Sequence, residues 1–176
     1  FYSLAYGPND NLWVSTDDGA YELRENEAIP FKEEDGLADD QTSQLLLDRE
    51  NNLWIGTENG ITKISPGVFV YYDATDGLPS NETFDIANDS EGNIWVATEE
   101  GLAIYSPDMQ LLDTMGKEDG LDSDLIYCVE QGPNGRMFIG TALSSWMWDG
   151  EKLSVIENTF SATYMLTDSK GRLWLG

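Results

Sequence analysis

The chain has 176 residues, of which 40% are apolar, and its 33 acidic residues against nine basic ones give a net charge of −24. Electrostatic repulsion by such a charge disfavours nucleic acids and anionic membrane surfaces as partners. The absence of histidine excludes Ser-His-Asp triads, Cys-His pairs and His-ligated zinc or iron sites within these residues.

Four short strand patterns follow one another at the start of the chain. An alternating run at residues 2–6 is followed by a turn at 7–10 and by a second strand that contains Trp13. The Thr-x-x-Gly sequence at residues 16–19 predicts a tight hairpin, because Gly accepts the positive φ that such turns require. Two further strand patterns complete the unit, and the last of them ends at Phe31.

This unit recurs along the chain. Each copy has an aromatic residue in its second strand, and successive aromatic residues are 41, 41, 43 and finally 36 positions apart. The aromatic residues are Trp13, Trp54, Trp95, Phe138 and Trp174. A fixed period near forty that is built from short β-rich runs predicts propeller blades of four strands each. No window shows a helical period over ten or more residues, so we expect an all-β fold.

The later copies are expected to place their strands at matching positions. Besides the strands with the aromatic residues, these lie at 43–47, 61–64, 68–72, 83–87, 102–105, 109–115, 125–129, 145–148, 153–156 and 163–166. The turns at 48–51 and 89–92 superficially resemble oxygen-rich calcium loops, but they lack the spaced ligands of an EF-hand. Because the same turn reads Gly-Pro-Asn-Gly at 132–135, we interpret all of them as hairpin turns. We expect no metal site and no cofactor.

An Asp-Gly-Leu sequence lies between consecutive copies, at residues 35–37, 76–78 and 119–121. Each falls between the fourth strand of one copy and the first strand of the next. Gly supplies unusual backbone angles, and Leu fits the groove between neighbouring blades. Because the sequence recurs in three links, we interpret it as structural.

These patterns predict a β-propeller with four four-stranded blades and two strands of a fifth. The expected repeats are approximately 1–35, 36–76, 77–119, 120–159 and an incomplete one at 160–176. We expect the chain to be a fragment of a seven-bladed ring, which needs roughly 290 residues at this period. Its single cysteine, Cys128, is expected to be a buried, inert thiol.

The repeated Asp-x-x-Gly/Asn-Asn-Leu-Trp motif, with its Thr-x-x-Gly hairpin and Asp-Gly-Leu link, resembles the two-component regulator propeller repeat. That family builds the periplasmic sensor regions of hybrid histidine kinases in Bacteroidetes, and its known ligands are largely oligosaccharides. The resemblance implies a non-catalytic, periplasmic sensor propeller, and the kinase and membrane helix are absent from these residues. Some propeller lyases have a loosely similar repeat, but their chemistry depends on a histidine that this chain lacks.

Two functions remain open from the sequence. The first is a sensor that responds to an oligosaccharide or a similar ligand, and the second is a structural or dimerisation scaffold with its ligand site elsewhere in the parent protein. We expect self-association or a homodimer of the parent, no nucleic acid partner and no direct insertion of this segment into a membrane. The unpaired strands of the fifth blade, at residues 163–166 and 173–176, are expected to promote self-association.

The fourth copy breaks the repeat and is the best clue to a ligand site. It replaces Thr-x-x-Gly by Thr-Ala-Leu-Ser at residues 141–144, and it places Trp146 where other copies have no consistently apolar residue. An aromatic ring beside small polar groups suits stacking on a sugar, whereas the alternative is that Trp146 only packs against a neighbouring blade.

The other ligand-binding candidates are Asp40, Asn81 and Asp124, which lie in the links. Links and hairpins carry about half of the acidic residues, and in a propeller they emerge on one face. A solvated acidic surface explains this charge, and the alternative is a rim that binds a cation or a neutral sugar.

Overall fold

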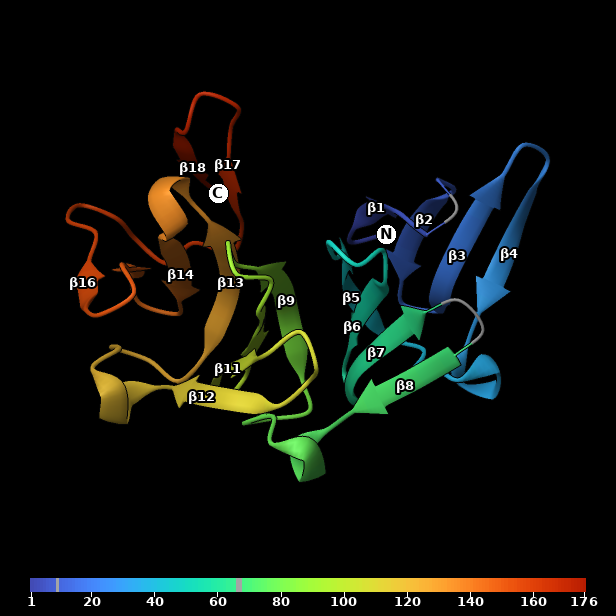
Figure 1. The fold of residues 1–176 in the computed structure, drawn as a ribbon, viewed down its shortest axis with the longest axis horizontal. Coiled ribbons are helices and arrows are strands. Elements are labelled where there is room, and N and C mark those ends of the chain that lie inside the picture. The colour runs from blue at the N-terminus through green and yellow to red at the C-terminus, as the bar shows by residue number, and fades with distance from the viewer. Residues whose placement is uncertain (9, 66–67) are drawn as a thin grey trace. The chain divides into compact units, whose positions relative to one another are not determined.

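The computed structural model describes residues 1–8, 10–65 and 68–176. The strands in these residues form four four-stranded antiparallel sheets and one two-stranded sheet (Figure 1). The expected all-β class, with four four-stranded blades and two further strands, is therefore confirmed. The chain divides into two compact units, Phe1–Ile86 and Ala87–Gly176, which are described separately.

The first unit contains two sheets in which each strand pairs with the next strand along the chain. The first sheet consists of β1 (Leu4–Tyr6), β2 (Leu12–Thr16), β3 (Gly19–Arg24) and β4 (Glu27–Phe31). The second sheet consists of β5 (Thr42–Leu47), β6 (Leu53–Thr57), β7 (Gly60–Ser65) and β8 (Val68–Tyr72). Short 3₁₀ turns follow each sheet, η1 at Glu33–Asp35 and η2 at Ala74–Asp76. The turn expected at 7–10 includes Asn9, which lies outside the described residues.

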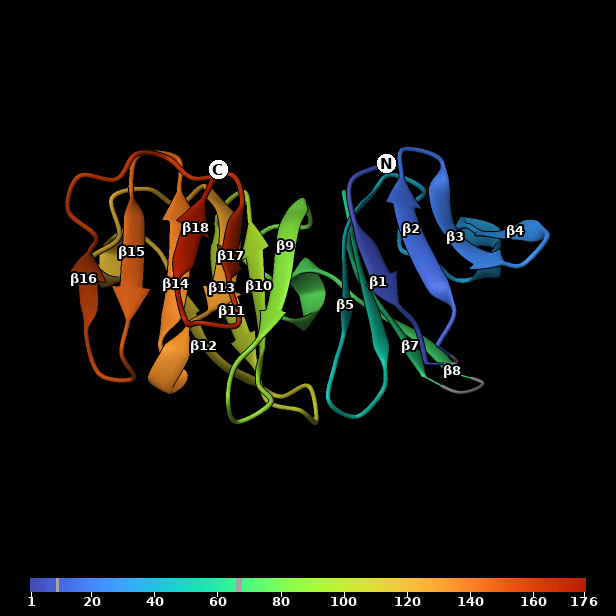
Figure 2. The same ribbon diagram turned by 90° about the horizontal axis from the view of Figure 1, so that it is seen from above.

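The second unit continues the same order, and β9 (Thr83–Asn88) lies across its boundary. The third sheet adds β10 (Ile94–Thr98), β11 (Gly101–Tyr105) and β12 (Leu111–Met115), followed by η3 (Lys117–Asp119). The fourth consists of β13 (Ile126–Gln131), β14 (Met137–Thr141), β15 (Ser145–Trp148) and β16 (Leu153–Val155), with η4 (Pro133–Gly135) after β13. The two-stranded sheet consists of β17 (Met165–Thr167) and β18 (Leu173–Leu175) (Figure 2).

Several strands differ from their expected bounds. β1 begins at Leu4 and not at residue 2, and β17 lies at Met165–Thr167 and not at 163–166. The fourth strand of the third copy was expected at 109–115, and β12 begins only at Leu111. Met109 has a left-handed φ of 60° and its N–H donates to the Ser106 carbonyl at 2.8 Å. Met109 therefore belongs to the preceding turn.

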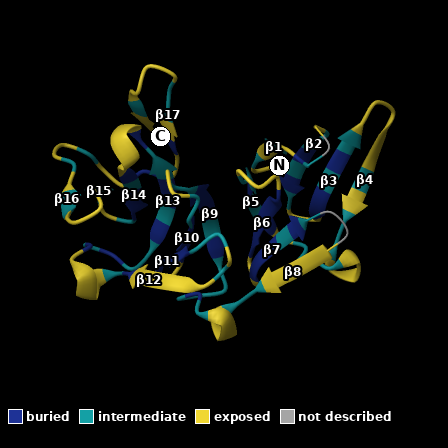
Figure 3. Cartoon of the chain, in the orientation of Figure 1, coloured by how far each residue is buried: buried dark blue, intermediate teal, exposed yellow. Residues whose placement is uncertain are grey.

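Each unit has a hydrophobic core that includes the leucine of an Asp-Gly-Leu link. In the first unit, Leu37 packs with Trp13 and Ala20 of the first sheet and with Leu53 and Ile64 of the second. Leu37 therefore fills the space between two neighbouring sheets, as expected. Figure 3 shows that the central strands β6 and β7 of the second sheet are largely buried, whereas β8 at its edge is exposed.

Leu121 has the same role in the second unit. It packs with Leu102 and Trp95 of the third sheet and with Ile126 and Ile139 of the fourth. The preceding glycines of these links have φ values near 114° at Gly36 and 112° at Gly120, which only Gly adopts readily. The structural interpretation of Asp-Gly-Leu is therefore supported in both units.

The repeated aromatic residues are not equally buried. Trp13, Trp54 and Trp95 are buried, Phe138 is half-buried, and the side chain of Trp174 is 54% exposed. The repeat predicts that all five aromatic residues occupy equivalent buried positions, and this prediction is wrong for Trp174 and is only partly met by the half-buried Phe138. In the described residues β18 has no third strand beside it, and the Arg172 guanidinium covers part of the Trp174 ring, 5.2 Å from its centroid.

In three of the five copies, the turn before the aromatic strand is organised by an aspartate. Asp48 Oδ1 accepts hydrogen bonds from the main-chain N–H groups of Glu50 and Asn52 at 2.9 and 2.8 Å. Asp48 Oδ2 accepts from the Asn52 side chain at 2.8 Å and from the indole Nε1 of Trp54 at 2.7 Å. One carboxylate therefore closes the turn and orients the core tryptophan.

Two other copies repeat this arrangement. The indole of Trp95 donates to Asp89 at 3.0 Å, and that of Trp174 donates to Asp168 at 3.1 Å. Their turn N–H groups bind the second carboxylate oxygen in the same way. Because protein donors occupy these oxygens, a hairpin role explains the conserved spacing of the turn.

The first and fourth copies have glycine at the position of this aspartate. A Cβ atom on Gly7 would lie 2.3 Å from Nε1 of Trp13, and one on Gly132 would lie 2.1 Å from the Phe138 ring. The aromatic ring therefore lies directly against the backbone of the turn, and any side chain there would displace it.

Candidate functional site

The three link candidates share one structural position. In Asp40, Asn81 and Asp124, the side-chain Oδ1 accepts a hydrogen bond from the main-chain N–H of the first residue of the preceding 3₁₀ turn. The donors are Glu33 at 2.8 Å, Ala74 at 2.7 Å and Lys117 at 2.7 Å. These contacts fix the links, so a ligand role for the three residues stays a prediction beside an observed structural one.

Hairpins and links meet in the first unit. The Gly19 N–H donates to the Asp40 carbonyl at 2.6 Å, and the Gly60 N–H donates to the Asn81 carbonyl at 2.8 Å. The Asn81 side chain also donates to Asn59 Oδ1 at 2.8 Å. In this unit, the acidic hairpins and links therefore lie side by side, as the propeller pattern predicts.

Local partners hold several of these carboxylates in the charged form. A hydrogen bond and the charge of Lys32, whose Nζ lies 2.5 Å from Asp18, lower the pKa of Asp18. Hydrogen bonds from Thr75 lower the pKa of Asp73, and those from Lys117 lower the pKa of Asp124. Within residues 1–8, 10–65 and 68–176, no group of three or more acidic, cysteine or histidine residues is placed to hold a metal ion.

The fourth sheet replaces the glycine hairpin by a carboxylate-bound one. In the regular copies, Gly60 and Gly101 have φ values of 111° and 143°, and the position of Asp122 is held by Ala38 or Pro79. In the fourth copy, Ser144 replaces the glycine and its φ lies outside the left-handed region.

Asp122 is the centre of this hairpin. The Thr141 hydroxyl donates to Asp122 Oδ1 at 2.6 Å, and the Ser144 hydroxyl donates to Oδ2. Burial raises the pKa of Asp122, but hydrogen bonds from Ser144 and Thr141, together with the nearby indole N–H of Trp146, outweigh this effect and leave the pKa below its ordinary value. The carboxylate is therefore ionised at neutral pH.

Trp146 lies beside the Asp122 carboxylate. Its ring is half-buried and packs against the core of the second unit, together with Trp148 and Leu153. Its Nε1 atom is buried and has no hydrogen bond of good geometry among the described residues, although it is close enough to contribute to the lowered pKa of Asp122. Packing and polar contact are thus combined at this position.

The sequence singles out Trp146 as a candidate, but it does not single out the polar residues that lie beside it. Asp122, Thr141 and Ser144 form the polar part of the cluster, whereas Asp124 forms an ion pair with Lys117 at 3.3 Å. The signal was present in the repeat, because Asp122 and Ser144 both stand where other copies have apolar residues or glycine. Asp40 and Asn81 belong to links of the first unit.

Cys128 is buried, as expected, and is outside this cluster. Its thiol donates to the Ala162 carbonyl at 3.2 Å and packs with Met165. The described part of the chain has no helix with the length and apolar character needed to cross a bilayer.

Solved structures with a similar fold match nearly the whole of this chain. The chain matches the extracellular domain assigned to a one-component system of B. thetaiotaomicron with a TM-score of 0.84 and 22% identity, covering 100% of this chain and 28% of that one. It also matches the extracellular domain assigned to a hybrid two-component system of the same organism, with a TM-score of 0.59 and 21% identity, over 98% of this chain and 31% of that one.

A lyase has a similar fold. Virginiamycin B lyase from Staphylococcus aureus matches with a TM-score of 0.76 and 11% identity, over 99% of this chain and 62% of the lyase. The chain spans less than a third of the two extracellular domains that it matches. A comparison with curated proteins finds no match.

The family comparison agrees with the repeat. The two-component regulator propeller family matches residues 36–59 and 77–100, which run from a link glycine to the hairpin after a buried tryptophan. These are the two copies in which an aspartate binds the indole of a buried tryptophan. The chain therefore carries two-component regulator propeller repeats within an all-β fold that matches part of larger propellers.

Proposed function

We propose that this chain is part of the extracytoplasmic sensor propeller of a two-component signalling protein, and that the parent protein is periplasmic or exposed outside the cytoplasm. The repeats at 36–59 and 77–100 support this proposal, as does the match of nearly the whole chain to part of two extracellular domains of bacterial signalling systems. A sensor of this kind works only if its ligand binds one conformation of the parent better than another.

The proposed ligand is an oligosaccharide or a similar hydroxyl-rich molecule. The observation that carries this part is the altered hairpin of the fourth sheet, where an ionised Asp122 and Ser144 lie beside Trp146. Carboxylate oxygens accept hydrogen bonds from sugar hydroxyls, and an indole ring stacks on the apolar face of a sugar. Leu143, 64% exposed, and Phe160, 84% exposed, add apolar surface near the same hairpin and link.

A second function is a scaffold whose ligand site lies elsewhere in the parent. The equal structural role of Asp40, Asn81 and Asp124 favours it, because a ligand site usually departs from the symmetry of a repeat. A lyase activity is not proposed. A catalytically inactive variant of virginiamycin B lyase differs by the loss of a histidine, and this chain has none.

Binding to a panel of neutral and acidic oligosaccharides tests the proposal by calorimetry. We expect Trp146→Phe, which keeps an aromatic ring but removes the indole N–H and part of the stacking surface, and Asp122→Asn to weaken binding of any sugar that binds by at least about tenfold, since each removes a contact of about 1.4 kcal/mol or more. Asp113→Asn, which removes a charge from the exposed strand β12, is the matched control and should leave binding unchanged. Binding that survives both site substitutions would favour the scaffold function.

A further inference from the structure

Two asparagines of the chain, Asn59 and Asn134, are followed directly by glycine, whereas every other asparagine precedes a residue with a side chain. An asparagine loses ammonia when the main-chain nitrogen of the next residue attacks its Cγ atom. A following glycine favours this attack, because it has no Cβ atom to obstruct the approach and its backbone is permissive. The two Asn-Gly pairs therefore share the same chemistry, and only their surroundings differ.

Hydrogen bonds hold the reacting atoms of the Asn59–Gly60 pair. The Gly60 N–H, whose nitrogen would attack, donates to the Asn81 carbonyl at 2.8 Å. The Asn59 side chain accepts from the Asn81 amide at 2.8 Å and donates to the Ala38 carbonyl at 3.5 Å. Gly60 itself is buried in the hairpin. The reaction at this pair therefore requires contacts between the hairpin and the neighbouring links to break first.

The Asn134–Gly135 pair lies in an exposed turn. Both residues belong to η4, between β13 and β14, and both are on the surface (Figure 1). Among residues 1–8, 10–65 and 68–176, no hydrogen-bond partner holds the Asn134 side chain. The ψ angle of Asn134, 31°, has to rotate to bring the Gly135 nitrogen against Cγ. No side-chain hydrogen bond of Asn134 opposes this rotation.

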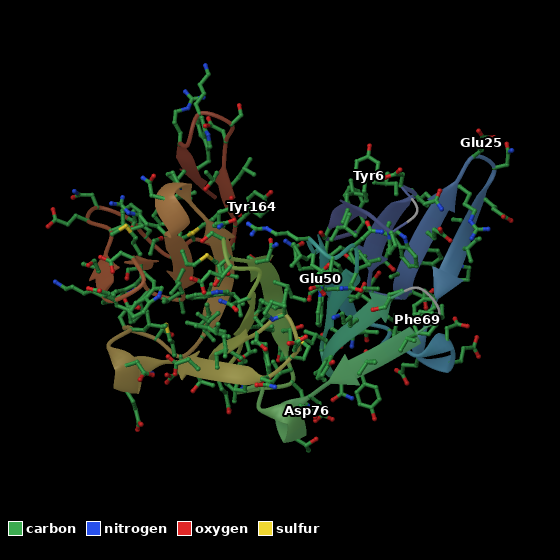
Figure 4. All side chains as sticks on the ribbon, in the orientation of Figure 1. Tyr6, Glu25, Glu50, Phe69, Asp76 and Tyr164 are labelled. Atoms are coloured by element: carbon green, nitrogen blue, oxygen red, sulfur yellow. The ribbon has the colours of Figure 1, made fainter. Side chains whose placement is uncertain are left out.

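The turn of the fourth copy also lacks the aspartate that closes this turn in three other copies. In the second copy, Asp48 accepts a hydrogen bond from the main-chain N–H of Glu50, which Figure 4 labels. In the fourth copy, Gly132 replaces this aspartate, and Asn134 takes the position of Glu50. The turn is closed by the Gly132 N–H, which donates to the Arg136 carbonyl at 2.8 Å. Exposed segments with few fixed contacts open locally at a low cost in free energy.

We propose that Asn134 is a site of spontaneous deamidation in the folded chain, and that Asn59 is protected from the same reaction. The Gly135 nitrogen forms a bond to Cγ of Asn134, and the side-chain nitrogen leaves as ammonia with the proton of the Gly135 N–H. Water then opens the cyclic imide. Cleavage at the side-chain carbonyl gives aspartate. Cleavage at the main-chain carbonyl gives isoaspartate, in which the main chain passes through Cβ and Cγ.

The isoaspartate product changes the turn that precedes an aromatic strand. It adds a methylene group to the main chain between Gly132 and Arg136, whose hydrogen bond closes the turn. Gly132 lies directly against the Phe138 ring, since a Cβ atom there would be 2.1 Å from the ring. Conversion of Asn134 is therefore expected to weaken the β13–β14 hairpin, and either product adds one negative charge at neutral pH.

Peptide mapping by mass spectrometry, after incubation of the whole folded chain at mildly alkaline pH, tests the proposal. We expect Asn134 to lose ammonia at least about tenfold faster than Asn59. A factor of ten needs only about 1.4 kcal/mol, and breaking the hydrogen bonds of Asn59 and Gly60 costs more. In denaturant both pairs are exposed, so the two rates should converge. Equal rates in the folded chain, a faster reaction at Asn59, or a reaction of Asn134 in denaturant only would each overturn the proposal.

Asn134→Gln is the matched variant for the effect on the turn. Glutamine retains the amide but has to form a larger ring, which closes much more slowly. After incubation, the wild-type chain should have a lower Tm than before, and the variant should keep its own Tm. An equal loss of Tm in the incubated variant, or an unchanged Tm in a wild-type chain that carries isoaspartate at this position, would overturn the effect assigned to Asn134.

Discussion

The second and fourth copies of the repeat use different residues to form the same hairpin and the same turn before the aromatic strand. In the second copy, Gly60 makes the hairpin by adopting a φ of 111°, and Asp48 orients Trp54. In the fourth copy, Ser144 makes the hairpin with the help of Asp122, and Gly132 leaves room for the Phe138 ring. In the second copy, the Asp48 carboxylate binds donors of its own turn and the indole of Trp54. In the fourth copy, Asp122 and Ser144 bind each other and also lie beside the half-buried Trp146. We therefore base the proposed site on the loss of the repeat pattern and not on the charge that the repeats share.

The largest expected effect concerns the buried tryptophan of the regular copy. Trp54→Ala should lower the free energy of unfolding by about 3–5 kcal/mol, because it empties a core site. Trp174→Ala, at an exposed ring on β18, should cost less than about 1 kcal/mol. Denaturant unfolding measures both. Equal losses of unfolding free energy in the two variants would show that the difference in burial between Trp54 and Trp174 does not affect stability.

The carboxylate of the turn comes next. Asp89→Ala should destabilise the chain by about 1–3 kcal/mol, since it leaves the buried Trp95 indole N–H without its acceptor. Glu91→Ala in the same turn is the control, because only its main-chain N–H takes part in the turn. A loss at Glu91 as large as that at Asp89 would contradict the role given to the carboxylate.

The two hairpins can be compared directly. Gly60→Ala should cost about 1–3 kcal/mol, because its Cβ would lie 2.2 Å from the Tyr72 carbonyl oxygen at a strained φ. Ser144→Ala removes one hydroxyl and should cost about 1 kcal/mol. Thermal unfolding of both variants measures the difference, and a larger loss for Ser144→Ala would reverse the comparison.

The smallest effect is a local response to pH in the two-stranded sheet. Hydrogen bonds, first of all from the Arg172 main-chain N–H, lower the pKa of Asp168 from 3.8 to about 2. A lowered pKa means that the charged carboxylate stabilises this turn above pH about 4 and that the contribution is lost as the pH falls toward 2. Trp174 fluorescence should change in this window.

Asp168→Asn is the matched variant for this titration. It retains the shape of the side chain but cannot titrate, so the fluorescence change between pH 4 and 2 should disappear. An unchanged titration in the variant would assign the signal to another carboxylate.

Much of the fold follows from the sequence because the repeat is local. The period of the aromatic residues placed the strands of four sheets, and the Asp-Gly-Leu links placed Leu37 and Leu121 in the two cores. The burial of Trp174 could not be read from its motif. Burial depends on the neighbouring strand, and the motif itself, including the bond to Asp168, is intact.

The candidate site was only half predictable. Trp146 stood out because it changes the residue type at its position, but Asp40, Asn81 and Asp124 were chosen for their place in acidic links. The side-chain oxygens of these three residues accept hydrogen bonds from main-chain N–H groups of the 3₁₀ turns. This contact depends on the path of the backbone, and a ligand role for the three residues stays a prediction. The approach of Asp122 to Ser144 joins residues 22 positions apart, and nothing in the local sequence of either residue encodes that distance.

The paired choice of aspartate or glycine before the aromatic strand limits how such an array can change over time. Asp48→Gly alone would leave the indole N–H of Trp54 without its acceptor. Gly132→Asp alone would place a carboxylate in the space that the Phe138 ring occupies. The first copy combines glycine with tryptophan, but there the Trp13 ring lies directly against Gly7, so the residue in the turn and the position of the ring have to change together and are expected to be epistatic within a copy. Copies that duplicate as whole units avoid this barrier, which favours growth of the array by duplication over conversion of one kind of turn into the other.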